Sequence, residues 1–154
     1  MAKRKSSGIL LYRNGEKELE VLLVLPGGPF WVNKDAGAWS IPKGEFDDTE
    51  TPLQAAIREF QEETGTRLQG DFLELRPIVQ KAGKQVYAFA QLGELDAAAI
   101  ICNTFKMEWP PKSGKWQSFP EVAKAQWFPI TSAKEQINPA QAAFLDELLQ
   151  KLDM

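Results

Sequence analysis

Apolar residues occur along the chain in runs that predict strands and two amphipathic helices. Two continuous apolar runs, 8–12 and 19–25, are joined by a polar connector containing Asn14-Gly15, a pair that favours a tight turn. We expect a β-hairpin, and the lack of polar alternation indicates strands covered on both faces. Further strands are predicted at 39–42, 72–79, 85–92, 104–109 and 125–130, with a turn at 80–84 and a loop at 110–120.

The first helix is predicted at residues 52–64. Thr51, Pro52 and Gln54 supply an N-cap, a first-turn proline and a capping-box partner. Gly65 supplies the left-handed residue that ends the helix. At about 100° per residue, one arc of this helix is apolar and is expected to pack inward. That arc consists of Leu53, Ala56, Ile57 and Phe60.

A second amphipathic helix is predicted near the C-terminus. Asn138-Pro139 followed by Gln141 repeats the cap and proline pattern. Its apolar face, expected to cover the sheet, comprises Ala140, Phe144, Leu145, Leu148, Leu149 and Leu152. Residues 131–136 are expected to form a short helical turn, whereas 96–101 fits either a helical turn or a buried segment.

The order of these elements predicts an α/β fold, in which strands flank one central helix and a second helix closes the sheet. A chain of 154 residues is expected to form a single domain, 1–154, with an ordered core over about 5–152. Hydrophobic residues make up 44% of the chain and charged residues 25%, proportions typical of globular proteins.

Composition excludes several kinds of chemistry and partner. The chain has no histidine, which removes Ser-His and Cys-His nucleophiles and histidine-ligated zinc. Cys102 is the single cysteine, so no intrachain disulfide forms and a cytoplasmic location is expected. A formal net charge of -3 gives no broad basic field, so we expect no nucleic-acid partner, and any polyanion binding must be local. Met1–Ser7 lacks the apolar run of a signal peptide and no segment approaches transmembrane length, so no membrane contact is expected.

Three glutamates, Glu59, Glu62 and Glu63, share one face of the first predicted helix. Like charges at these spacings repel by a few tenths of a kcal/mol per pair, and the helix dipole disfavours negative charge in the last turn. Arg58 relieves only part of this through Glu62, whereas a hard divalent cation would relieve the rest. The alternative is a solvated acidic helix face.

The spacing of fixed residues around these glutamates follows a known pattern. Gly44, five residues, Glu50, seven residues and Arg58-Glu59 are followed by Phe60-Gln61, Glu62-Glu63 and then, one residue later, Gly65. This pattern resembles the Nudix box of the Nudix hydrolases. The departure is Thr66, where the family prefers an aliphatic residue at a packing position. The resemblance implies the α/β Nudix fold, a mixed β-sheet sandwiched between α-helices.

The resemblance also implies roles for individual residues. It implies that Glu59, Glu62, Glu63 and the backbone carbonyl at Gly44 are ligands of Mg²⁺, with Mn²⁺ as a substitute. It makes Arg58 the residue that orients the glutamates, supported by Glu50, and Gly65 structural. The general base is left open between Glu59, Glu62 and an acid from a distant loop, Glu108.

Substrate contacts are expected outside this pattern. Lys43, in a Pro-Lys-Gly segment common among Nudix enzymes that act on nucleotide polyphosphates, suits a phosphate oxygen, or is a plain surface lysine. A base can stack on Trp109 or Trp116 while Lys112 or Lys115 meets phosphate, although such aromatics are more often core. Phe30 and Trp31 either line a pocket or cover the core.

The sequence therefore predicts a metal-dependent pyrophosphohydrolase that cleaves a phosphoanhydride in a nucleoside diphosphate-linked small molecule, most plausibly a nucleoside or dinucleoside polyphosphate. One alternative is a non-catalytic, nucleotide-binding Nudix-like sensor domain. Another is an isomerase on the same fold that pairs a carboxylate with Cys102. The oligomeric state is left open.

Overall fold

The computed structural model describes residues 4–29, 36–80 and 83–154. Within them, a seven-stranded mixed sheet has the order β4-β6-β1-β2-β9, with β3 paired to β1 and β5 paired to β6. A separate two-stranded sheet pairs β7 with β8. The strands are β1 Lys5–Asn14, β2 Leu19–Pro26, β3 Lys43–Glu45, β4 Leu73–Glu74, β5 Ile78–Val79, β6 Gln85–Leu92, β7 Thr104–Glu108, β8 Trp116–Pro120 and β9 Val122–Pro129.

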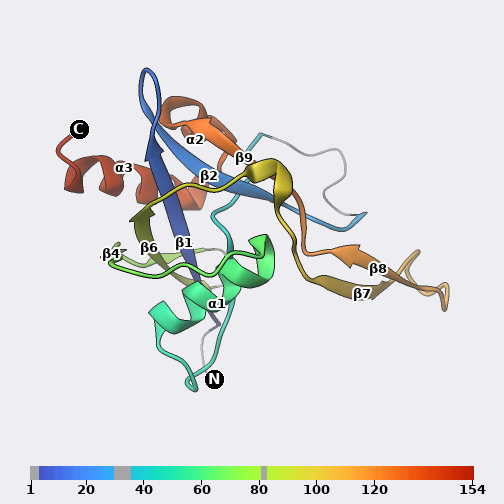
Figure 1. Cartoon of the computed structure of the whole chain (residues 1–154). Helices are drawn as coiled ribbons and strands as arrows, with labels where there is room; N and C mark the ends of the chain where they lie inside the picture. Colours follow the sequence, from blue (N-terminus) through green and yellow to red (C-terminus); the bar gives the residue numbers. More distant parts are fainter. Residues whose placement is uncertain (1–3, 30–35, 81–82) are drawn as a thin grey trace.

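Helices cover both faces of the large sheet, with α1 on one side and α2 and α3 on the other (Figure 1). The helical segments are α1 Pro52–Thr64, η3 Ala97–Ala99, α2 Ile130–Gln136, η4 Pro139–Gln141 and α3 Ala142–Lys151. The predicted sandwich of a mixed sheet between helices is therefore confirmed. No helix among the described residues is long and apolar enough to cross a bilayer.

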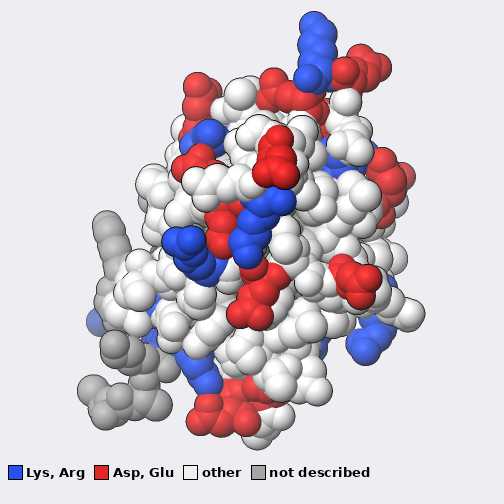
Figure 2. Space-filling view, turned by 90° about the vertical axis from the view of Figure 1, so that its left-hand side faces the viewer, with Lys and Arg blue, Asp and Glu red and all other residues white. Residues whose placement is uncertain are grey.

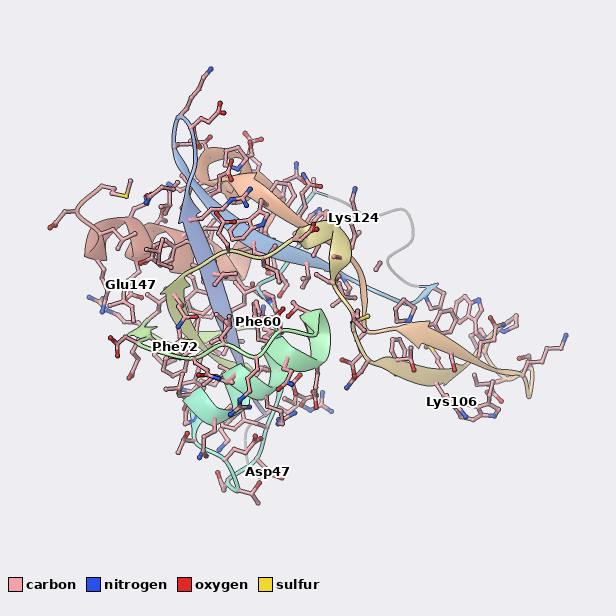
Figure 3. The ribbon with its side chains drawn as sticks, viewed as in Figure 1. Asp47, Phe60, Phe72, Lys106, Lys124 and Glu147 are labelled. Carbon is pink, nitrogen blue, oxygen red and sulfur yellow. The ribbon has the colours of Figure 1, made fainter. Side chains whose placement is uncertain are left out.

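Strand alternation divides the core into two layers. Ile9 and Leu11 point toward Phe60 of α1, whereas Leu10 points toward Phe144 of α3, and all five side chains are fully buried. Successive residues of a strand face opposite sides, so the continuous apolar run in β1 supplies both layers at once. Figure 3 shows Phe60 on the helix that carries the glutamates. Packing of this apolar arc fixes which way the acidic face of α1 points.

Local capping sets the ends of α1 as the sequence predicts. The Thr51 side chain accepts a hydrogen bond from the Gln54 backbone, and the Gln54 side chain accepts one from the Thr51 N–H. Gly65 ends the helix with φ 83°, a left-handed conformation in which a side chain would be strained. The Ser7 hydroxyl donates to the Pro52 carbonyl at 2.6 Å, which ties the start of the helix to β1.

Other sequence predictions differ in their details. The hairpin of β1 and β2 is confirmed, with Asn14 opposite Leu19. The strand predicted at 39–42 is wrong, because only isolated bridges form there and the strand starts at Lys43, after Pro42. The strand predicted at 72–79 splits into β4 and β5 at Pro77, which lacks the N–H that a ladder needs.

Three further regions complete the comparison. Residues 96–101 contain the short η3 turn, capped by the Asp96 side chain. The predicted loop 110–120 is partly wrong, because Trp116–Pro120 forms β8. The expectations for Phe30 and Trp31, and for the centre of the turn at 80–84, lie outside the described residues.

A buried glutamine holds the segment that leads into β3. Gln141 is 1% exposed; its Oε1 accepts a hydrogen bond from the Ile41 N–H at 3.0 Å, and its Nε2 donates to the Ser40 hydroxyl at 3.1 Å. One residue later, the Pro42 carbonyl accepts from the Ile9 N–H at 3.1 Å. These bonds fix the backbone immediately before Lys43 and Gly44.

Replacing Gln141 by Leu should lower the free energy of unfolding by about 1–3 kcal/mol, because the buried Ile41 N–H loses its acceptor. Urea unfolding followed by circular dichroism measures this. Gln150→Leu, on the exposed side of α3, is the matched control and should change stability little. Equal stability of the Gln141→Leu variant and the parent would contradict this role.

Candidate active site

The C-terminal half of α1 lies against β3, and this contact forms the candidate site. Glu59 is 8% exposed, although it is a charged residue. Its carboxylate lies so close to Gly44 that a Cβ at that position would overlap the carboxylate oxygens. Gly44 is therefore required for a close approach of helix and strand, a role that the sequence pattern alone does not reveal.

Arg58 connects the acidic residues around it. Its Nε and Nη2 donate to the two carboxylate oxygens of Glu50, both at 2.8 Å. Its Nη1 donates to Glu59 at 2.8 Å and to Glu62 at 3.2 Å. The bidentate pairing lowers the pKa of Glu50, and Arg58 thereby links Glu50 to Glu59 and Glu62.

The carboxyl groups of Glu59, which is buried, and of Glu63, which is partly buried, lie where negative charge is unfavourable. Burial raises the pKa of Glu63 to about 9, and the carboxylates of Glu59 and Glu121 act in the same direction. Burial, followed by repulsion from Glu62, raises the pKa of Glu59 to about 7, although Arg58 opposes the shift. Deprotonating all these groups together is costly without an additional cation.

Glu121 is a fourth acidic residue of this cluster, and the sequence analysis missed it. It lies between β8 and β9, and burial followed by repulsion from Glu62 raises its pKa. Its N–H donates to the Asn103 carbonyl at 2.9 Å, and the Asn103 N–H donates to the Glu62 carbonyl at 2.8 Å. No local sequence signal marks Glu121, because only the pairing of distant segments brings it to α1.

The donor set can be compared with the needs of a metal ion. As the side chains stand, no three acidic or cysteine side chains of the described residues are grouped closely enough to hold an ion. Arg58 draws Glu59 and Glu62 to itself, while the Lys43 N–H donates to Glu63. The donors are nevertheless all oxygens, and carboxylates held with raised pKa values favour a hard dication such as Mg²⁺ or Mn²⁺. Binding would require these side chains to converge from the present arrangement.

Lys43 is partly buried rather than a plain surface lysine. Burial lowers its pKa, the nearby Lys84 adds to that shift, and the carboxylate of Glu63 opposes it. On β3 it lies opposite Gly8 of β1, directly before Gly44. Its position beside the acidic cluster keeps it as a candidate contact for substrate phosphate.

The remaining predicted residues lie on the hairpin of β7 and β8, which projects away from α1 (Figure 1). Both carboxylate oxygens of Glu108 accept backbone hydrogen bonds, from Lys112 at 3.0 Å and Gly114 at 3.1 Å. This geometry makes Glu108 a turn-stabilising residue and gives no support to its assignment as general base. Trp109, Lys112 and Lys115 also belong to the hairpin or its turn and are not gathered around the carboxylates.

The isomerase alternative required Cys102 to work with a carboxylate. The Cys102 thiol instead lies 3.5 Å from the Val122 carbonyl, to which it donates a hydrogen bond. It also packs against the apolar layer beneath α1. These contacts describe a partly buried structural cysteine.

Comparisons with known proteins identify similar sequences and folds. The family model described as the NUDIX domain matches residues 2–148. Over 142 residues the chain is 30% identical to an RNA pyrophosphohydrolase of Brucella anthropi, covering 82% of this chain and 75% of that protein.

Two solved structures illustrate the likeness in fold. The NUDIX domain of Shewanella oneidensis NrtR, in complex with ADP ribose, has a TM-score of 0.67 and 18% identity, covering 100% of this chain and 90% of that one. A Caenorhabditis elegans Ap4A hydrolase, in a binary complex, has a TM-score of 0.65 and 18% identity, covering 96% and 98%. At such identities, the structural likeness establishes the fold alone.

The raised pKa of Glu63 predicts how the metal-free protein responds to pH. The unfolded chain releases the Glu63 proton near the ordinary pKa of 4.5. The folded state holds that proton until the pH reaches about 9. This contribution to stability is therefore complete below pH 4.5 and is lost as pH rises through 9. In the presence of EDTA, the urea midpoint of the parent should fall relative to that of Glu63→Gln as the pH rises from 4.5 to about 9.

Glu16→Gln, on the exposed connector of β1 and β2, is the control for loss of a carboxylate and should follow the parent at every pH. A constant difference between the parent and Glu63→Gln from acidic to alkaline pH would contradict the buried, protonated state of Glu63.

Proposed function

The chain belongs to the NUDIX domain family and is a hydrolase that acts on phosphoanhydrides, and from this premise we propose a metal-dependent pyrophosphohydrolase of nucleoside or dinucleoside polyphosphates. The observation that carries the proposal is the cluster of buried, mutually repelling carboxyl groups at the end of α1. Such a cluster lowers the stability of the free protein. A bound dication would relieve the repulsion between the carboxylates and would in turn hold a polyphosphate.

Each acidic residue has a distinct task in this proposal. Glu59, Glu62 and Glu63 would hold the ion, with the backbone carbonyl of Gly44, whose missing side chain lets Glu59 approach. Bound there, Mg²⁺ or Mn²⁺ would neutralise negative charge that develops on the phosphates. Arg58 keeps Glu59 and Glu62 oriented before binding, and its pairing with Glu50 anchors the guanidinium.

Hydrolysis also needs a base that accepts the proton of the attacking water. Glu59 and Glu62 remain candidates, and Glu121 replaces Glu108 as the acid contributed from outside α1. Glu121 fits because it lies near Glu62, and because burial and repulsion from Glu62 raise its pKa, which makes its carboxylate a stronger proton acceptor. Glu108 does not fit, because its oxygens already accept two turn N–H groups.

The substrate class rests on the site and on the names of similar proteins. Lys43 places one positive charge beside the carboxylates, which suits a phosphate oxygen beyond the reach of the metal. The similar proteins are named as an RNA pyrophosphohydrolase and an Ap4A hydrolase, or are seen with ADP ribose. These compounds share a phosphoanhydride linked to a nucleoside, the feature that we propose for the substrate here.

Two further expectations concern the location of the protein and the alternative function. We place the protein in the cytoplasm, since a single cysteine suits a reducing compartment. The alternative of a non-catalytic nucleotide sensor is disfavoured, because binding alone does not require a costly buried carboxylate cluster. Tight nucleotide binding with no hydrolysis of any compound in a Mg²⁺-containing panel would favour the sensor.

Replacing Glu62 or Glu63 by Gln should reduce turnover by at least about 100-fold, since each change removes a ligand charge but little volume. Release of phosphate and pyrophosphate should be measured with Mg²⁺ on nucleoside triphosphates, dinucleoside polyphosphates and 5′-triphosphorylated RNA. Glu16→Gln is the matched control, and circular dichroism checks folding. Near-parent turnover in either active-site variant would refute its assignment as a metal ligand.

A further inference from the structure

The hairpin of β7 and β8, residues 104–120, forms an arm beside the candidate active site. Figure 1 shows it extending from the body of the molecule, and Figure 3 shows Lys106 on it, well away from the large sheet. The arm starts at the carboxylates, because the Asn103 N–H donates to the Glu62 carbonyl and Glu121 follows its last strand. A ligand held at Glu62 therefore has the arm directly available as a continuation of its binding surface.

Two aromatic rings secure the arm to the body and leave a third exposed. Phe105 and Phe119 face each other across the hairpin with ring centroids 5.9 Å apart, and Phe105 also lies against Gly28 at the end of β2. Trp116 lies opposite Glu108 at the far end of the ladder and is 68% exposed. A two-stranded ribbon has little core of its own, so an exposed tryptophan on it gains little from folding alone.

The charge of the arm is opposite in sign to that of the whole chain. Lys106, Lys112 and Lys115 are exposed, and within the described part of the chain none of them forms an ion pair. The one acidic residue of the arm is Glu108, so its formal charge is 3 − 1, or +2, in a chain of net charge -3. The Glu108 carboxylate accepts hydrogen bonds from the turn backbone rather than pairing with these lysine side chains. The lysines are therefore available to bind an external anion.

The arrangement on one side of the ribbon combines stacking and charge. Lys106 pairs with Ser118 and Glu108 pairs with Trp116, so alternation along the strands places Lys106 and Trp116 on the same side. Proteins that bind single-stranded nucleic acid combine aromatic rings, on which bases stack, with cationic side chains that contact the phosphates. Five-residue strands extend about 17 Å, a platform of the size on which other sheets stack two or three bases.

We propose that this arm binds a single-stranded RNA segment that continues from the nucleotide whose 5′-polyphosphate lies at the carboxylates. The placement of that 5′ end rests on the proposed function, while the contact between arm and RNA does not. A protein partner fits less well, because the cores of protein interfaces are depleted in lysine, and the arm carries three exposed lysines, Lys106 on the ribbon and Lys112 and Lys115 in its turn. RNA is favoured also by the activity in the name of the Brucella anthropi relative.

RNA binding by the arm differs from the expectation, drawn from the sequence, that nucleic acid is not a partner. That expectation came from the net charge, and on the face shown in Figure 2 positive and negative side chains are indeed interspersed without a broad basic area. The lysines of the arm are instead a local site, the one form of polyanion binding that the composition leaves open. A local site implies weak, salt-sensitive binding of a short segment.

The test is fluorescence anisotropy with a short, labelled, single-stranded RNA that carries a 5′-hydroxyl and has no phosphoanhydride to hydrolyse. Trp116→Ala should weaken binding by about tenfold, within the range for loss of one base stack, whereas Trp116→Phe should retain most of the affinity. Replacing Lys106, Lys112 and Lys115 by Ala together should reduce the slope of log affinity against log salt by about 2, at roughly 0.7 per phosphate contact. Lys17→Ala, in the connector of β1 and β2, is the exposed control and should bind as the parent does.

Three outcomes would overturn the inference. One is unchanged RNA affinity and salt slope in the arm variants. Another is absence of RNA binding by a parent protein that hydrolyses nucleotides, which would leave the proposed function intact. The third is that light scattering shows Trp116→Ala to dissociate a dimer without any change in RNA affinity, which would make the arm a self-association surface. Conversely, RNA binding through the arm without hydrolysis of any nucleotide would sink the proposed function alone.

Discussion

The close packing of the Glu59 carboxylate against the backbone of Gly44 is the constraint on which the site depends. It places a charged group in a buried position, beside Glu63 and within the influence of Glu62 and Glu121. Arg58 compensates part of that charge through Glu59 and Glu62 but leaves Glu63 without a cationic hydrogen-bond partner. The folded chain therefore sustains an unfavourable electrostatic arrangement, which is the usual mark of a functional site rather than of a stabilising one.

Packing elsewhere in the structure offsets the loss of stability caused by the acidic site. The apolar arc of α1, including the fully buried Phe60, packs on the β1 residues Ile9 and Leu11. On the opposite face α3 buries Phe144, and Gln141, just before α3, holds the segment that leads into the strand of Gly44 through its hydrogen bonds. Packing on both faces of one sheet thus fixes helix and strand independently, so that their acidic contact persists despite its cost.

Local signals in the sequence predicted α1 well. The capping box at Thr51 and the left-handed Gly65 act within a few residues, so the bounds 52–64 could be derived without tertiary information. Trp116–Pro120 was assigned to a loop, because β8 depends on pairing with β7 and on the contact of Phe105 with Phe119. The sequence pointed to Glu108 rather than Glu121 as the acid outside α1 for the same reason. The pairing of β7 with β8, and not spacing along the chain, decides which acidic residue lies near α1.

The most direct test of the proposed metal site is a crystal structure with Mn²⁺ and a non-hydrolysable nucleotide polyphosphate, in which anomalous scattering locates the ion. The proposed metal site predicts an anomalous peak bound by Glu59, Glu62 and Glu63, with the Arg58 guanidinium shifted toward Glu50. Saturating Mn²⁺ with no peak among these side chains, or a peak bound only by the nucleotide, would contradict it.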